Sequence, residues 1–308
     1  RMNLYGMNFD YLGKGRAAAI LSMLLVLVSL GSFLFKGMNF GIDFTGGTLV
    51  EASYDRPVEL EQIRALLSKA GFEGQVQHFG TASDVIIRLP TIEGQTAAQL
   101  SEKILGALRV DGYQVELKRL EFVGPQVGEE LTVQGLQAVA WVAIGILIYI
   151  YFRFEWRFAV NGVITLLHDV IVTVGFLSLF QLEFDLVVLA SVMAAAGYSL
   201  NDTIVVFDRI RENFLRMRKA TPAEVINSSV NQTLTRSIIT GGTTLFVLIA
   251  LYFWGGDVLK GFSLAMIVGI IVGTYSSLFI APYLVLRMGV TKADLMPPEK
   301  EGVEAQRP

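Results

Sequence analysis

The chain has 308 residues, of which 53% are hydrophobic and only 17% charged, and its formal net charge is −3. Soluble domains carry about 25% charged residues, so this composition, with a mean hydropathy of +0.52, indicates a membrane protein. The acidic balance gives no reason to expect nucleic-acid binding, and the absence of cysteine excludes disulfides, thiolate metal sites and cysteine nucleophiles.

Six stretches are apolar over the roughly 20 residues that a helix needs to cross a bilayer. We predict transmembrane helices at about 17–35, 131–152, 158–182, 186–207, 237–256 and 261–286. The first stretch lacks a small-residue cleavage site, so we expect it to be kept as an anchor. An even number of spans places both termini on the same side of the membrane.

The short loops predict the orientation, because Lys and Arg accumulate on the cytoplasmic side. Arginines occupy both ends of 153–157, and the 208–236 connection is rich in Arg and Lys, whereas 183–185 has no basic residue. We therefore expect a cytoplasmic N-terminal segment (1–16) and a cytoplasmic tail (289–308). Residues 36–130 would then lie outside.

Strand and helix signals alternate through 36–130. We expect strands at 48–54, 74–80, 84–90 and 113–124, and helices at 59–71 and 96–110. The resulting order, β-α-β-β-α-β, predicts a small α+β domain of the ferredoxin-like class on the periplasmic side. The predicted fold class is thus a polytopic α-helical membrane protein with one such domain.

Two glycine-bearing segments flank this domain, "GIDFTGG" (41–47) and "VGPQVGEEL" (123–131). Glycine permits left-handed turns and close backbone approach. The segments are either tight connectors or hinges that let the domain move, and the sequence leaves both interpretations open. The residues concerned are Gly41, Asp43, Gly46, Gly47, Gly124, Pro125 and Gly128.

The chain contains neither a P-loop nor an H-E-x-x-H motif, so we expect no ATP hydrolysis, no enzyme activity, no metal and no cofactor. Chemistry is expected instead from polar residues within the spans, which are His168, Asp169, Asn201, Asp202 and Arg236. A charged side chain in the bilayer costs at least about 2.5–3.5 kcal/mol, so it is retained only if paired, hydrated or useful.

Depth suggests how these residues are arranged. Asp169 lies near the midplane and Asp202 about 10 Å inside the cytoplasmic boundary, at 1.5 Å per helical residue. If the fifth helix begins near Asn231, Arg236 reaches a similar depth, so we predict that Asp202 pairs with Arg236. Arginine would favour the ionised carboxylate and desolvation the neutral acid, a balance suited to loading and releasing a proton.

Structural alternatives exist for each of these residues. Asp202 and Arg236 could form a static ion pair that only fixes helix register. His168 and Asp169 could belong to a proton relay or could help to pack it. The small residues at 194–199 and 240–244 are explained by close helix packing alone.

Several motifs resemble those of the SecD/SecF family of bacterial protein-export membrane subunits, and within it the SecF type. They are "FGIDFTGGTLVE", "EFVGPQVGEEL", "FRFEWR", "LHDVIVTVG", "GYSLNDTIVVFDRIREN" and "QTLTRSIITGGTTL", and they span about residues 36–288 in the family's order. The resemblance implies an auxiliary subunit of the Sec translocase in the bacterial inner membrane. With SecD, it would use the proton motive force to promote late steps of preprotein export.

The resemblance further implies the SecYEG channel, YajC, exported preproteins and protons as partners, and a relation to the resistance–nodulation–division transporters. In the family, the Asp of the "ND" pair and the Arg heading the fifth span are tied to proton conduction, which here are Asp202 and Arg236. Unlike fused SecDF chains, this chain has one small exported domain, so the larger one would reside on a separate SecD.

Two other functions stay open from the sequence. A proton-coupled small-molecule transporter of the same superfamily would share the charged helices but would need a larger exported domain than 36–130. A non-conducting assembly subunit of the translocon would need no titrating Asp202, and measurements of proton flux would distinguish it.

Overall fold

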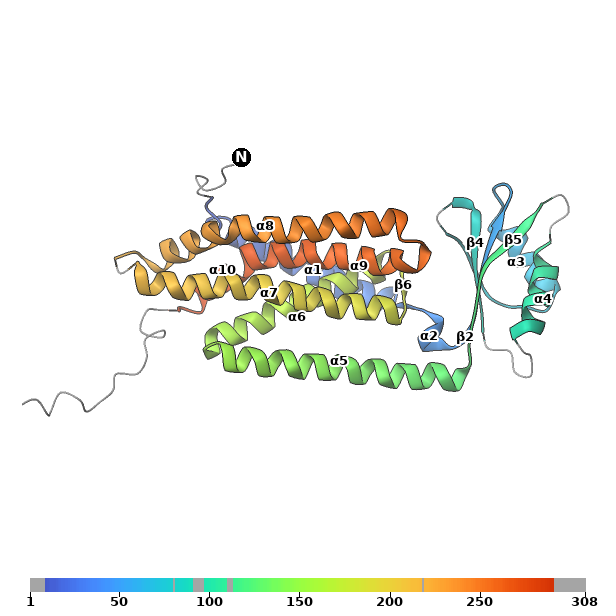
Figure 1. Ribbon diagram of the computed structural model, residues 1–308, viewed down its shortest axis with the longest axis horizontal. Helices are drawn as coiled ribbons and strands as arrows, with labels where there is room; N and C mark the ends of the chain where they lie inside the picture. Colours follow the sequence, from blue (N-terminus) through green and yellow to red (C-terminus); the bar gives the residue numbers. More distant parts are fainter. Residues whose placement is uncertain (1–8, 80, 91–96, 110–112, 218, 291–308) are drawn as a thin grey trace, which may run out of the picture. The chain divides into compact units, whose positions relative to one another are not determined.

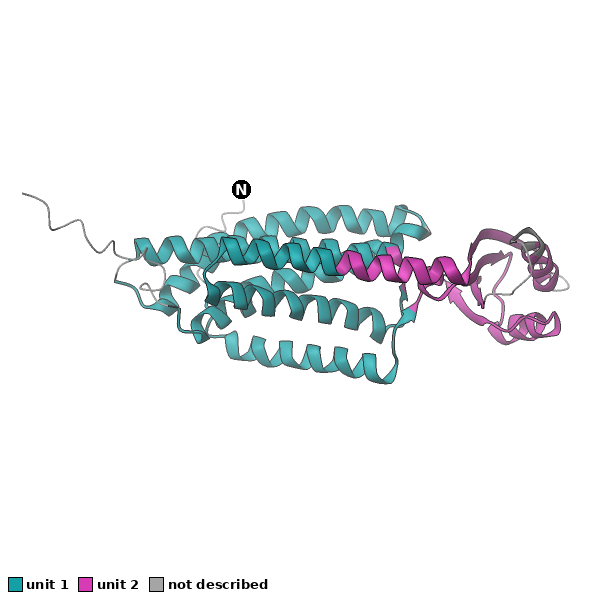
Figure 2. Cartoon of the chain, turned by 90° about the horizontal axis from the view of Figure 1, so that it is seen from below, with its two compact units in different colours: residues 1–39, 140–183, 187–308 teal, residues 40–139, 184–186 magenta. Residues whose placement is uncertain are grey.

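The computed structural model describes residues 9–79, 81–90, 97–109, 113–217 and 219–290. The chain divides into two compact units, one formed by 1–39, 140–183 and 187–308, the other by 40–139 and 184–186 (Figure 2). Residues 1–8 of the predicted N-terminal segment and residues 291–308 of the predicted tail lie outside the described residues.

In the part of the chain that is described, six helices are long and apolar enough to cross a membrane, as predicted. Five are α1 (Gly15–Phe35), α5 (Pro125–Arg153), α6 (Trp156–Leu179), α7 (Leu186–Arg216) and α8 (Pro222–Trp254). The sixth consists of α9 (Asp257–Tyr275), the π-helical turn η2 (Ser276–Ile280) and α10 (Ala281–Arg287). Figure 1 shows α6 to α9 running side by side.

The fifth helix begins at Pro222, before the predicted apolar span 237–256 and before Asn231, the start assumed in the depth argument. A capping box starts it, because the Thr221 hydroxyl accepts from Glu224 N at 3.3 Å and the Glu224 carboxylate accepts from Thr221 N at 2.8 Å. Hydropathy missed this start because the first turns of α8 are polar. The fourth helix likewise continues beyond its apolar stretch, to Arg216.

Aromatic and small residues pack the helical unit. The Phe207 ring of α7 lies 5.1 Å from the Phe158 ring and 5.7 Å from the Phe154 ring. Between α1 and α6, a Cβ on Gly175 would lie 2.2 Å from the Ser29 Cβ, so only glycine permits this approach. By contrast, α5 is the least buried of the six helices, with 11% of its most apolar window buried.

The second unit contains a four-stranded antiparallel sheet in the order β3-β4-β2-β5. Its elements are β2 (Gly47–Tyr54), α3 (Leu60–Lys69), β3 (Gln75–Phe79), β4 (Thr81–Leu89), α4 (Ala97–Leu108) and β5 (Val115–Val123). Their order along the chain is the strand-helix-strand-strand-helix-strand order predicted from the sequence. Both helices cover one face of the sheet, with Ile63, Leu67 and Ile104 packed in the same core as Val50 and Ile87 (Figure 1).

Three short elements complete the chain. They are β1 (Asn39–Phe40), α2 (Ile42–Thr45) and β6 (Glu183–Phe184), and β1 pairs with β6. Within the second unit, Ile42 packs with Leu49 and Ile86 on the sheet face opposite α3 and α4.

Candidate functional site

Asp202 is buried in α7 and is held by two serine hydroxyls from other helices. Ser237 Oγ of α8 donates to Asp202 Oδ1 and Ser277 Oγ of η2 donates to Asp202 Oδ2, both at 2.6 Å. Each carboxylate oxygen therefore has one hydroxyl donor. Hydrogen bonds to an ionised group are the stronger kind, and they offset part of the cost of burying the carboxylate.

The predicted ion pair between Asp202 and Arg236 is absent from the described residues, so that prediction was wrong. Ser237 takes the buried position on α8, whereas Arg236, one residue earlier, lies on the exposed side of the helix. Successive helical residues point about 100° apart, so Arg236 does not point at Asp202 when Ser237 does. Depth was an insufficient guide because it ignores direction around the helix axis.

Asp169 forms a second buried carboxylate centre, on α6. Its Oδ1 lies 2.8 Å from His168 Nδ1, and its Oδ2 accepts from Ser276 Oγ of η2 at 2.7 Å and from Ser199 Oγ of α7. The His168 Nε2 atom is buried and has no hydrogen-bond partner within the described ranges. The pair predicted from "LHDV" is thus in direct contact, and three helical segments converge on it.

The π-helical turn η2 serves both centres through consecutive residues. Ser276 donates to Asp169 and Ser277 donates to Asp202, and both serines are fully buried. π-helical turns occur often at functional sites, where the extra residue redirects side chains.

Sequence reasoning missed Ser237, Ser276 and Ser277, and it included Ser199 only in the 194–199 stretch that helix packing explains. The signal that could have found them is a pair of adjacent serines inside an otherwise apolar, uncharged span. Asn201 was predicted to take part, but it lies on the exposed side of α7 and is not among the groups that bond either carboxylate.

The two glycine-bearing segments meet within the second unit. A Cβ on Gly128 would lie 3.0 Å from Gly46 N, and Thr132 Oγ1 donates to Phe44 O at 3.3 Å. Gly41 N donates to Phe184 O at 2.9 Å, and Pro125 is the first residue of α5. These contacts show the close backbone approach that the glycines allow; hinge motion stays a prediction.

Asp43 of the first segment caps α7. Its Oδ2 accepts from the backbone N of Leu186, the first residue of that helix, at 3.0 Å. A helix leaves its first N–H groups without internal partners, and an acidic side chain there also interacts favourably with the helix dipole.

Replacing Asp43 by alanine is expected to destabilise the protein by about 1 kcal/mol, the usual effect of losing an N-terminal cap. Thermal unfolding of the purified chain in detergent would measure the change. Asp43→Asn keeps an oxygen acceptor and should lose less, whereas equal losses in the two variants would contradict the capping role.

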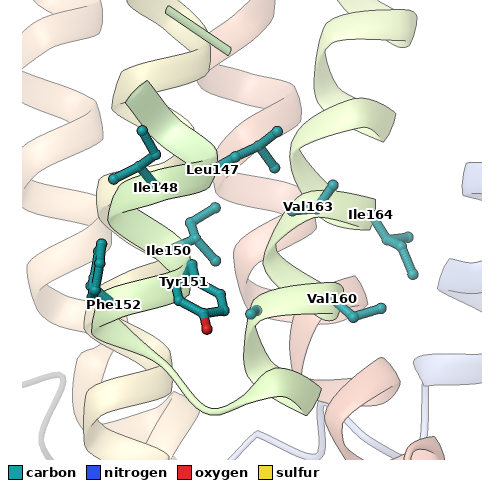
Figure 3. Close-up of a pocket in the computed structure, with 9 residues that line it drawn as sticks. Leu147, Ile148, Ile150, Tyr151, Phe152, Val160, Val163 and Ile164 are labelled. Atoms are coloured by element: carbon teal, nitrogen blue, oxygen red, sulfur yellow. The ribbon is translucent and has the colours of Figure 1, made fainter. Parts of the chain in front are cut away.

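A pocket of about 500 Å³ opens between α5 and α6. Figure 3 shows its lining, which is Leu147, Ile148, Ile150, Tyr151, Phe152, Ala159, Val160, Val163 and Ile164. All are apolar except for the Tyr151 hydroxyl, and no ionisable acid or base of the two carboxylate centres lines it. This pocket is therefore separate from both carboxylate centres. Within the described ranges, no three His, Asp or Glu side chains are grouped as a metal site would require.

Comparison with protein families gives two matches. Residues 101–291 match the family described as "Protein export membrane protein SecD/SecF, C-terminal", and residues 31–58 match the "SecD/SecF GG Motif". The second match contains the 41–47 segment, and the first contains both carboxylates.

Curated relatives are similar over nearly their whole length. A SecF protein translocase subunit from Vibrio alginolyticus is 47% identical, and the alignment covers 94% of this chain and 93% of the relative. One from Pseudomonas aeruginosa is 46% identical with complete coverage of both chains. Among solved structures, a SecDF from Thermus, described as a translocon-associated membrane protein, superposes with a TM-score of 0.83 at 37% identity. That alignment covers 94% of this chain and 40% of the Thermus chain.

Proposed function

The chain belongs to the SecD/SecF family of protein-export membrane proteins, and from this premise we propose that it is the SecF subunit of a Sec translocase. With SecD, it uses the proton motive force to promote late steps of preprotein export across the inner membrane. SecYEG is the channel it works with, and YajC is a further member of the complex. The translocase names of its relatives support the transport role, which is not enzymatic.

The proposal places both termini in the cytoplasm and residues 36–130 in the periplasm, with the sheet as a ferredoxin-like domain. The arginine-rich loops support this orientation. The strand order β3-β4-β2-β5 with two helices on one face supports the fold class.

One observation carries the proton-coupling part of the proposal. Asp169 and Asp202 are buried in helices that fit membrane spans. Among the described residues, their side-chain hydrogen-bond partners are serine hydroxyls and a histidine, and none is an Arg or Lys. A static structural carboxylate in a membrane is expected to have a cationic partner. Hydroxyls can accept from a protonated carboxyl as readily as they donate to an ionised one, so these sites suit both protonation states.

In the proposal, the 41–47 segment is the route from Asp202 to the periplasmic domain. Asp43 caps α7 at Leu186, and the same helix carries Asp202. A shift of α7 on protonation of Asp202 would therefore act on the Gly46–Gly47 junction at the start of β2. In the proposal, this motion helps to pull the emerging preprotein outward.

Export by vesicles that contain SecYEG, SecD and this chain tests the proposal. We expect the rate of late preprotein export to rise when a proton gradient is imposed and to fall to the basal rate when an ionophore collapses it. Proton flux through the vesicles should require both this chain and SecD. Export that does not respond to the gradient, with no chain-dependent flux, would favour a non-conducting assembly subunit.

We further propose that Arg236 faces SecD. It is exposed on a helix that fits a membrane span, where an unpaired guanidinium is costly, so a carboxylate on the partner subunit is the group that suits it.

Arg236→Ala is expected to lower gradient-driven export several-fold and to reduce the amount of SecD that copurifies with the chain. Arg216→Ala is the matched control, because Arg216 is also exposed but ends α7 and pairs with Glu212 at 2.7 Å. If Arg236→Ala exports preprotein and copurifies with SecD at the level of the unsubstituted chain, Arg236 has no place in the proposal.

A further inference from the structure

We infer that the π-helical turn η2 couples the two buried carboxylates, so that the protonation state of one changes the protonation equilibrium of the other. The inference rests on the proposed proton-handling function and deepens it. It adds Ser276 and Ser277 as positioning residues that link two sites on different helices.

The geometry of the turn is the first step. Ser276 Oγ lies 2.7 Å from Asp169 Oδ2 on α6, and Ser277 Oγ lies 2.6 Å from Asp202 Oδ2 on α7. The two serines are consecutive, so one peptide unit joins the donors of both carboxylates. Because both serines are fully buried, water does not replace these bonds when they break.

Each hydroxyl also has a second acceptor, which makes it a two-position switch. Ser276 Oγ lies 3.0 Å from Gly273 O, and Ser277 Oγ lies 3.0 Å from Thr274 O. A hydroxyl has one hydrogen, so it donates either to the carboxylate or to the carbonyl of the preceding turn.

The carboxylate's charge decides which acceptor the hydroxyl uses. An ionised carboxylate is the stronger acceptor, so the serine donates to it. When the carboxyl is protonated, its own O–H donates to the serine oxygen and the serine hydrogen turns to the backbone carbonyl. Protonation at Asp169 thereby turns a hydroxyl donor to Gly273 O, which also accepts from the backbone N of Ser276, the residue before Ser277. Protonation at Asp202 likewise turns the Ser277 hydroxyl to Thr274 O.

A π-helical turn is suited to pass this change on. Its backbone bonds span five residues in place of four, and such turns occur frequently at functional sites. The change in hydrogen bonding therefore reaches a segment that departs from the regular α-helical pattern.

The other groups near the carboxylates do not provide such a link through η2. His168 contacts Asp169 from its own helix, and Ser237 contacts Asp202 from α8. The Tyr275 hydroxyl donates to Ala18 O, the Tyr198 hydroxyl bonds the Thr244 hydroxyl, and Arg236 is exposed. Ser199 donates to Asp169 from α7, one turn before Asp202, and would itself be a second, weaker route.

Infrared titration of the full chain in phospholipid vesicles tests the coupling. The carbonyl band of protonated Asp202 is assigned by its loss in Asp202→Asn, and its titration midpoint is measured with and without Asp169→Asn. We expect Asp169→Asn to move the Asp202 midpoint by about one pH unit or more, as for a coupled pair. In a Ser276→Ala or a Ser277→Ala background, we expect most of that shift to disappear, with only the weaker contribution of Ser199 left.

Two further variants separate the hydroxyl's role from packing. Ser191→Ala removes another fully buried serine, whose hydroxyl bonds Val188 O, and should leave the shift intact. Ser276→Thr keeps a hydroxyl and should restore the shift that alanine removes.

Three results would overturn the inference. The first is a midpoint that does not respond to Asp169→Asn. The second is a response that persists undiminished in both alanine backgrounds, which would indicate direct electrostatic coupling. The third is a loss that Ser276→Thr does not restore. The titration requires no translocation. The coupling can therefore be absent while gradient-driven export still depends on Asp202. Equally, the coupling can be present although export proves independent of protons.

Discussion

Asp202→Asn is expected to abolish the stimulation of export by a proton gradient and to reduce the rate to that measured with the gradient collapsed. Asparagine has nearly the same shape as aspartate and can bond both Ser237 and Ser277, so the packing around η2 is kept. It cannot exchange a proton. The expected loss is therefore a loss of coupling, without a loss of structure.

Stability measurements separate these two effects. Removing a charge from a membrane span relieves part of the roughly 2.5–3.5 kcal/mol penalty of burying it, so Asp202→Asn should unfold at the same temperature or higher. Asp208→Asn is the control, since Asp208 lies six positions further along α7, is half-exposed and pairs with Arg153. Proton coupling through Asp202 would be refuted if Asp202→Asn shows gradient-driven export at the same rate as the Asp208→Asn control.

Gly47→Ala is expected to unfold or severely destabilise the α+β unit. Gly47 starts β2 with φ at 123°, a conformation that strains residues with a side chain, and an added Cβ would lie 2.5 Å from Leu89 O. That oxygen belongs to the backbone of β4, which pairs with β2, so it cannot move aside without breaking the sheet. Backbone strain alone contributes about 1–3 kcal/mol, a large part of a domain's stability of about 5–15 kcal/mol.

Two other glycines isolate the two components of this effect. Gly71 has φ at 80° with no heavy atom within 4 Å of an added Cβ, so Gly71→Ala reports strain without a clash. Gly124, in the second glycine-bearing segment, has neither a positive φ nor a neighbour within 4 Å, so Gly124→Ala should be nearly silent. Protease digestion measures the resistance of each variant, which we expect to fall from Gly124→Ala through Gly71→Ala to Gly47→Ala. A Gly47→Ala variant that is as resistant as Gly124→Ala would contradict this order.

The sequence predicted those features that depend on composition along a helix or strand. Apolar runs identified all six long helices, and local alternation identified the strands of the α+β unit in their order. Helix ends were harder to predict from the sequence, because Thr221 caps the start of α8 in a polar region that a hydropathy window excludes. Where capping residues occur in such a region, they are the better guide.

The sequence predicted the two acidic residues of the candidate site, but not the groups that form hydrogen bonds with Asp202. His168 and Asp169 are adjacent in sequence, and their contact needed no tertiary knowledge. The partner of Asp202 depends on which face of α8 turns inward, and depth alone chose Arg236 where the structure has Ser237. Serines in membrane helices are common packing residues, so the adjacent pair Ser276 and Ser277 was a weak signal in the sequence, and only the geometry of η2 brings them to the two acids.

The exposure of α5 has a consequence for the subunit before it is assembled. With 11% of its apolar window buried, α5 depends on lipid or on another protein, more than on its own chain, for most of its contacts. Proteases in cells remove proteins of marginal stability. If SecD covers this face of α5, the cellular half-life of the chain should therefore depend on the supply of SecD. Newly made chains would then be degraded when they outnumber SecD, and the ratio of the two subunits would be kept by turnover.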